Sequence, residues 1–151
     1  MIRIIIELSM SFIGAMGFAF VFNSKHQHLL YLGLGGVVAW AGYIVSHLFI
    51  ESIPLCYFIA ASTATLYSEI FARILKTPTT TVLIPALIPA IPGSMLYYTM
   101  LYLIESQWKE FFTMGTDTLK VAAAIALGIA SVSLVIKSVL SFSRRQKYYH
   151  S

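Results

Sequence analysis

The chain alternates long apolar stretches with short polar joins. Five apolar segments can be read, at residues 2–22, 29–50, 54–72, 79–104 and 118–142. As helices rising about 1.5 Å per residue, each is long enough to cross a hydrocarbon layer of about 30 Å. The joins leave no room for a soluble domain. The pattern predicts an all-α integral membrane protein of about five transmembrane helices, with a single transmembrane domain over residues 1–151 and a short basic cytoplasmic tail at 143–151.

Composition supports the membrane class. The chain is 58% hydrophobic and 11% charged, with a mean hydropathy of +0.81, whereas soluble domains carry about 25% charged residues. The net charge of +4 is not the footprint of nucleic-acid binding, because the basic residues sit at segment ends and in the tail, where they set topology and contact anionic lipid. One side of the predicted bundle carries Lys25, Arg73, Lys76, Arg144, Arg145 and Lys147. The positive-inside rule therefore predicts an external N-terminus and a cytoplasmic C-terminus.

The fourth segment is interrupted by prolines. Pro85, Pro89 and Pro92 form the pattern Pro-x-x-x-Pro-x-x-Pro, and Gly93 follows. Each proline removes a backbone donor and crowds the carbonyl four residues back, so the fourth helix is expected to be broken. Backbone groups freed at membrane depth must face protein, a ligand or a water-filled cavity. The break is consistent either with a kinked span that only packs or with the irregular geometry that transporters use to bind substrate.

Three ionisable residues in or next to the predicted spans are candidates for function. Glu69 and Arg73 have i, i+4 spacing near the cytoplasmic end of the third span, where they form an end-of-helix pair or receive an anionic substrate. Glu7 lies about two turns into the first span, where it pairs with Arg3 or acts as a protonatable group for proton coupling.

Other polar residues give weaker signals. Ser94 and Tyr97 flank the break, where their hydroxyls would satisfy freed backbone groups or contact a substrate. His26 and His28 have no third ligand, so no metal site is predicted. Nucleophile elbows, phosphate loops and metalloprotease motifs are lacking, and neither an enzyme nor a cofactor is expected.

Small residues recur at helical spacing in three segments. Such stripes allow close helix approach in lipid, and they predict a compact bundle or contacts with another chain, including a homo-oligomer. The stripes are Gly35, Ala39, Gly42 and Ser46; Ala60, Ala64, Ser68 and Ala72; and Ala122, Ala126 and Ala130.

The order of these motifs resembles the threonine/serine exporter family, specifically its five-span C-terminal half, which split members encode as a separate small subunit. The resemblance rests on three stretches: GFAFVFN at residues 17–23, GLGGVVAWAGY at 33–43, and SEIFARILKTPTTTVLIPALIPAIPGSMLYY at 68–98. The third stretch combines an arginine, a proline and a Pro-x-x-Pro-Gly core at family-like spacing.

The resemblance implies a secondary exporter of small polar metabolites in a bacterial-type cell membrane. Threonine and serine are the namesake substrates, and dicarboxylates such as succinate belong to related two-subunit members. A second five-span subunit is the implied partner. The expected substrate path comprises Asn23, Glu69, Arg73, Pro85, Pro89, Pro92, Gly93, Ser94 and Tyr97. The alternative is a non-transporting membrane scaffold or assembly subunit, for which the small-residue stripes alone would suffice.

Overall fold

The computed structural model describes residues 2–149 of the chain, and the side chains of residues 2–139. Every regular element in the described part is helical, which confirms the all-α prediction. The elements are α1 (Ile2–Val21), η1 (His26–His28), α2 (Leu29–His47), α3 (Ile53–Leu75), α4 (Thr79–Leu87), η2 (Ile88–Ala90), α5 (Gly93–Ile104) and α6 (Trp108–Tyr149).

Four of these helices are long and apolar enough to cross a membrane, namely α1, η1 with α2, α3, and α6 as far as Val139. The pair formed by α4–η2 and α5 passes the same test together but is bent by 60°. The count is therefore four spans, or five with the bent pair, as the apolar segments predict. The membrane boundaries of each span stay a prediction.

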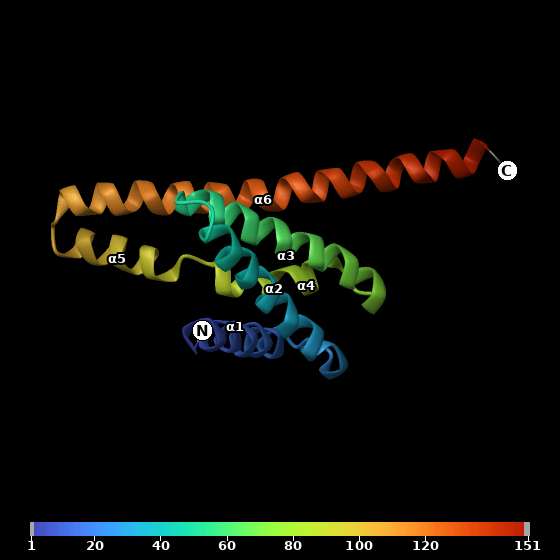
Figure 1. Ribbon diagram of the computed structural model, residues 1–151, viewed down its shortest axis with the longest axis horizontal. Coiled ribbons are helices and arrows are strands. Elements are labelled where there is room, and N and C mark those ends of the chain that lie inside the picture. Colours follow the sequence, from blue (N-terminus) through green and yellow to red (C-terminus); the bar gives the residue numbers. More distant parts are fainter. Residues whose placement is uncertain (1, 150–151) are drawn as a thin grey trace.

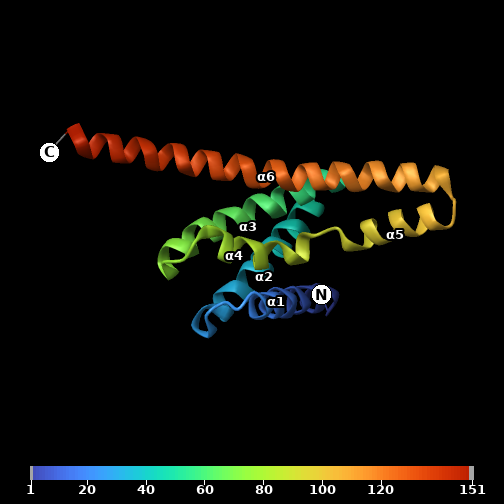
Figure 2. The ribbon, with the colours of Figure 1, turned by 180° about the vertical axis from the view of Figure 1, so that it is seen from behind.

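The helices pack in a layered bundle (Figure 1). Helix α2 contacts α1 on one side and α3 on the other, and α4 packs against both α2 and α3 (Figure 2). Helix α3 also packs against α6. Both views show α5 and the first part of α6 lying side by side as a hairpin that extends past the ends of α1, α2 and α3.

Two of the three predicted small-residue stripes lie at helix contacts. All four stripe residues of α3 are buried, as are Gly35, Ala39 and Ser46 of α2. Gly42 of α2 is half-buried, and a Cβ there would lie 2.5 Å from the Thr63 hydroxyl oxygen. The close approach of α2 and α3 thus depends on small side chains, as expected in lipid.

The stripe predicted for the last segment does not lie at a contact between helices of this chain. Ala122, Ala126 and Ala130 are exposed, whereas Val121 and Gly128 are the buried residues of this part of α6. A Cβ on Gly128 would lie 2.6 Å from the Phe58 carbonyl oxygen of α3. Because both lipid-facing and helix-facing sides of such a helix are apolar, small-residue spacing alone does not say which one is buried.

Helix α6 is also longer than the predicted fifth segment. It begins at Trp108 and runs for 42 residues, about 63 Å at 1.5 Å per residue. Most of the expected polar join at residues 105–117 is therefore helical, and the expected tail is helical as far as Tyr149. This join lies on the hairpin of α5 and α6, where much of the surface is exposed.

The break in the fourth segment is confirmed, but the three prolines act differently. Pro85 lies inside α4 without ending it. Pro89 is in the short 3-10 turn η2, and the chain leaves helical geometry at Ile91, whose ψ of 126° is extended. Pro92 then precedes α5. The 60° bend therefore arises at Ile91–Pro92, because proline cannot donate to the preceding turn.

Candidate functional site: a carboxylate pocket beside the broken helix

A pocket of about 280 Å³ opens where α1, α2 and the broken segment meet. Its lining combines the Glu7 carboxylate with the Trp40 indole and with Pro89 of η2. The remaining lining residues are Met10, Ser11, Gly14 and Ile88. The pocket thus brings an ionisable residue of the first span next to the irregular backbone of the fourth.

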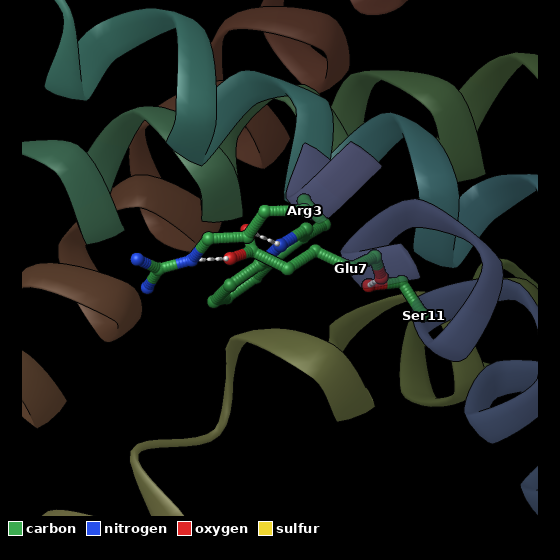
Figure 3. Close-up of polar contacts among 4 residues, drawn as sticks. Arg3, Glu7 and Ser11 are labelled. Atoms are coloured by element: carbon green, nitrogen blue, oxygen red, sulfur yellow. Dashed lines mark hydrogen bonds and ion pairs between the residues drawn. The ribbon is translucent and has the colours of Figure 1, made fainter. Parts of the chain in front are cut away.

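Glu7 is held at this pocket by two side-chain contacts. Its Oε1 accepts a hydrogen bond from the Arg3 Nε at 2.9 Å, and its Oε2 accepts one from the Trp40 Nε1 at 3.3 Å (Figure 3). The Arg3 side chain is 91% exposed, whereas that of Glu7 is 31% exposed. The expected i, i+4 pair is therefore formed, and the carboxylate also has a partner on a different helix.

Trp40 begins an aromatic row along α2. Its ring stacks on Tyr43 with centroids 4.8 Å apart, and Tyr43 stacks in turn on His47 at 5.8 Å. The i, i+3 and i+4 spacing places these rings on one helix face. Tyr57 of α3 packs against Tyr43 at 4.9 Å. This packing fixes the orientation of the indole that donates to Glu7.

The backbone at Pro89 lacks its usual donors. A 3-10 turn would supply the N–H of residue 92, but Pro92 has none. An α-helix would supply the N–H of Gly93, but this group donates to the Ile91 carbonyl at 2.8 Å. The Pro89 carbonyl therefore receives neither helical bond. Such a group at membrane depth requires a polar environment.

Next to the pocket, α2 packs closely against α1 and η2 at Gly36. A Cβ on Gly36 would lie 2.5 Å from the Ala15 Cβ, 2.8 Å from the Ser11 carbonyl oxygen and 3.3 Å from Pro89 Cγ. Only glycine allows α1, α2 and η2 to approach this closely. The position of Pro89 relative to Glu7 is thus set by the backbone of α2.

Glu69 and Arg73 lie elsewhere, in the last turns of α3. Arg73 Nη2 is 2.9 Å from Glu69 Oε2, and the Arg73 guanidinium also donates to the Glu69 carbonyl. The Glu69 side chain is only 10% exposed. The pair is adjacent to the start of α4, and the twelve residues of α4 and η2, about 18 Å, separate that end from the break.

The other predicted path residues do not form one cluster. Gly93 and Ser94 are exposed at the start of α5, and Tyr97 is 63% exposed one turn later. Asn23 follows α1 with a φ of 53°, a left-handed conformation that asparagine tolerates at a helix end. Near it, Ser24 lines a pocket of about 170 Å³ with Thr80 and Thr81.

Pattern reading missed Trp40 and Ser11 as companions of Glu7. The sequence contains a signal for Ser11, because the small residues Ser11, Ala15 and Ala19 follow Glu7 at intervals of four. In the structure all three are buried. This is the inward face of α1. For Trp40, only the tertiary contact identifies the role. In the described part of the chain, no group of three or more His, Cys, Asp or Glu residues is placed to hold a metal ion.

A comparison with protein families gives a specific match. The family model described as "Threonine/Serine exporter, ThrE" covers residues 7–135. This range contains Glu7, Trp40, the whole broken segment and most of the apolar part of α6. Neither a curated protein nor a solved structure matches the chain. Since the matched range takes in most of the sequence and all elements of the pocket, the chain belongs to the threonine/serine exporter family, a family of membrane transporters with a general role in amino-acid export.

Proposed function

We propose that this chain is the small subunit of a two-component secondary exporter of small polar metabolites, working with a second five-span subunit in a bacterial-type cell membrane. The substrates are threonine- or serine-type amino acids, or dicarboxylates such as succinate. The N-terminus lies outside and the C-terminus in the cytoplasm, as the distribution of basic residues favours.

One observation carries the proposal: the broken fourth segment lies against a pocket that contains a carboxylate. Broken helices supply unpaired backbone groups, and ionisable residues inside spans are costly unless they have a function. A kinked helix with only a packing role would not need Glu7 beside Pro89. The two features together are typical of a substrate or ion site.

In this proposal, substrate enters from the cytoplasmic side and leaves through the pocket. Arg73 stands at the cytoplasmic end, where its exposed guanidinium attracts anionic groups. The broken segment α4–η2–α5 lines the path, and Glu7 takes up and releases a proton as the two subunits rock between inward- and outward-open states. The second subunit supplies the other wall of the path.

The test is efflux of labelled threonine, serine and succinate from cells that lack their own exporters. Three strains are compared: one with this chain, one with a five-span partner subunit from the same genome, and one with both. Efflux only from the third strain is the expected result and identifies the substrate class. Efflux with this chain alone would replace the two-component arrangement by a homo-oligomer. If both proteins are present in the membrane and none of the three compounds leaves, the proposal is wrong for these substrates.

A scaffold role makes a different prediction about water access. In a variant with Cys56→Ala and Ser94→Cys, the new thiol lies just after the break, and the native thiol, which is buried, is absent. A wet path predicts reaction with a small polar thiol reagent, slowed by added substrate. A scaffold predicts no effect of substrate. The matched control places the cysteine at Ser138, an exposed residue on α6 remote from the break.

A further inference from the structure

We infer that the pocket between α1, α2 and η2 binds the ammonium group of an α-amino acid on Glu7, while Arg3 takes the carboxylate of the same molecule. The inference deepens the proposed function, because it assigns a substrate group to named residues and favours amino acids over dicarboxylates. Its transport consequences rest on that function, whereas the binding itself does not.

The Glu7 carboxylate has acceptor capacity to spare. An ionised carboxylate has about four lone-pair sites, and the contacts with Arg3 and Trp40 use two. The Trp40 contact, at 3.3 Å, is longer than the usual range for N–H···O hydrogen bonds. The side chain is still partly exposed toward the pocket. A cationic donor can therefore reach the carboxylate without removing the indole.

Two further residues that line the pocket carry acceptor atoms. The Ser11 hydroxyl donates to the Glu7 carbonyl at 2.8 Å, so its proton is engaged and its oxygen can still accept. The Pro89 carbonyl receives no helical N–H, as described above. An ammonium group has three donors and no acceptor. The pocket thus offers a carboxylate, a hydroxyl oxygen and a carbonyl belonging to pocket-lining residues.

Trp40 adds a second attraction for a cation. Tryptophan has the most favourable ring face for cation–π contacts, and the effect grows where water is excluded. Because the ring is stacked on Tyr43, a ligand can contact at most the opposite face. The remaining lining, Met10, Gly14 and Ile88, is apolar and suits a small side chain.

Arg3 is suited to be a displaceable partner. Its side chain is 91% exposed, and ion pairs at such exposure contribute little to stability. Its planar guanidinium matches a carboxylate in bidentate geometry. In an α-amino acid the ammonium and carboxylate groups are attached to the same carbon. Such a zwitterion can insert into the Arg3–Glu7 pair, with each charge facing its opposite and no net charge added to the pocket.

A dicarboxylate lacks the group that this pocket selects. Its second carboxylate would face Glu7 with like charge, and a repulsive contact of this kind is an effective source of specificity. The geometry therefore favours threonine and serine over succinate at this site.

The experiment measures binding, not transport. The chain contains two tryptophans, Trp40 and Trp108, so in the purified Trp108→Phe chain the fluorescence reports on the pocket alone. The titrants are L-threonine, L-threonine amide, N-acetyl-L-threonine and succinate. We expect saturable changes with the two amines, and affinity at least about tenfold weaker for N-acetyl-L-threonine and succinate, the loss expected when a charge-assisted hydrogen bond is removed.

Two variants separate a binding role from a structural one. Glu7→Gln keeps the size of the side chain and an oxygen that can accept from Trp40, and it should weaken threonine binding at least about tenfold. The control, Glu51→Gln, changes an exposed carboxylate in the α2–α3 connection and should leave binding unchanged. Arg3→Gln should weaken threonine more than threonine amide, because only the former has a carboxylate.

Equal affinity for threonine and N-acetyl-L-threonine would overturn the inference. Full threonine affinity in Glu7→Gln would also overturn it, and so would the lack of a saturable response to either amine. These results are independent of the efflux experiment. Amine binding without efflux would support the site and refute the exporter proposal. Threonine efflux that requires both subunits would support the exporter proposal. If threonine and N-acetyl-L-threonine also bound with equal affinity, the proposed site would be refuted.

Discussion

The closest packing around the pocket makes Gly36 the most informative position to change. In Gly36→Ala the new methyl group would lie 2.5 Å from the Ala15 Cβ and 2.8 Å from the Ser11 carbonyl oxygen. Carbon atoms in contact are normally about 3.5–4.0 Å apart. The α1 and α2 backbones must therefore separate by about 1 Å or more, since neither contact is the end of a flexible side chain.

The free-energy cost of the steric clash can be separated from the gain in helix propensity. Overpacking in a close-packed interior costs about 1–3 kcal/mol, while replacing a helical glycine by alanine gains up to about 1 kcal/mol. Gly17 of α1 provides the matched control, because a Cβ there has no neighbour within 4 Å. Both variants gain the same propensity, so their difference isolates the clash. We expect Gly36→Ala to be less stable than Gly17→Ala by about 1–3 kcal/mol.

The assay is unfolding of the purified chain by SDS in mixed micelles, followed by tryptophan fluorescence. Threonine efflux in the two-subunit strain is measured in parallel, and here Gly36→Ala should also reduce transport, because Trp40 of α2 and Pro89 of η2 move relative to Glu7 of α1. A double variant, Gly36→Ala with Ala15→Gly, removes the nearer contact but not the Ser11 carbonyl. Because Ala15→Gly itself costs up to about 1 kcal/mol of helix propensity, the double variant is compared with Ala15→Gly alone. The destabilisation caused by Gly36→Ala should be smaller in that background than in the unchanged chain.

Equal stability of the Gly36→Ala and Gly17→Ala chains would refute the close approach of α1 and α2 at Gly36. It would also remove the physical reason for the position of Pro89. Loss of efflux with unchanged stability would point instead to a direct contact between substrate and Gly36.

Two further predictions concern residues remote from the pocket. Arg73→Ala should lower efflux at least about tenfold. The amount of protein in the membrane should stay normal, which quantitative immunoblotting of membranes checks. Unchanged efflux would leave Arg73 with only a topological role. Thr99→Val removes the buried hydroxyl contact between Thr99 and Thr118, whose oxygens are 3.2 Å apart, and should destabilise the α5–α6 hairpin by about 1 kcal/mol. Faster proteolysis within the hairpin is the measurement, and Thr116→Val, at an exposed position on α6, is the control.

The amino-acid sequence by itself determined the class of the protein. Long uncharged stretches allow only helices in lipid, because every backbone group must be satisfied within its own segment. Three prolines and a glycine in one such stretch were enough to predict a broken span. The spacing of Glu69 and Arg73 predicted their pair, since i, i+4 neighbours meet on any helix.

Only the tertiary structure decided which faces meet. In lipid the hydrophobic pattern does not distinguish a buried face from an exposed one, because both are apolar. For this reason the spacing of the α6 alanine stripe did not indicate that it is exposed in this chain, and the inward row of α1 was not recognised. The contact of Glu7 with Trp40, 33 residues away, and the pocket that Glu7 shares with Pro89 have no local signature. Both depend on the close approach of α1, α2 and η2 at Gly36.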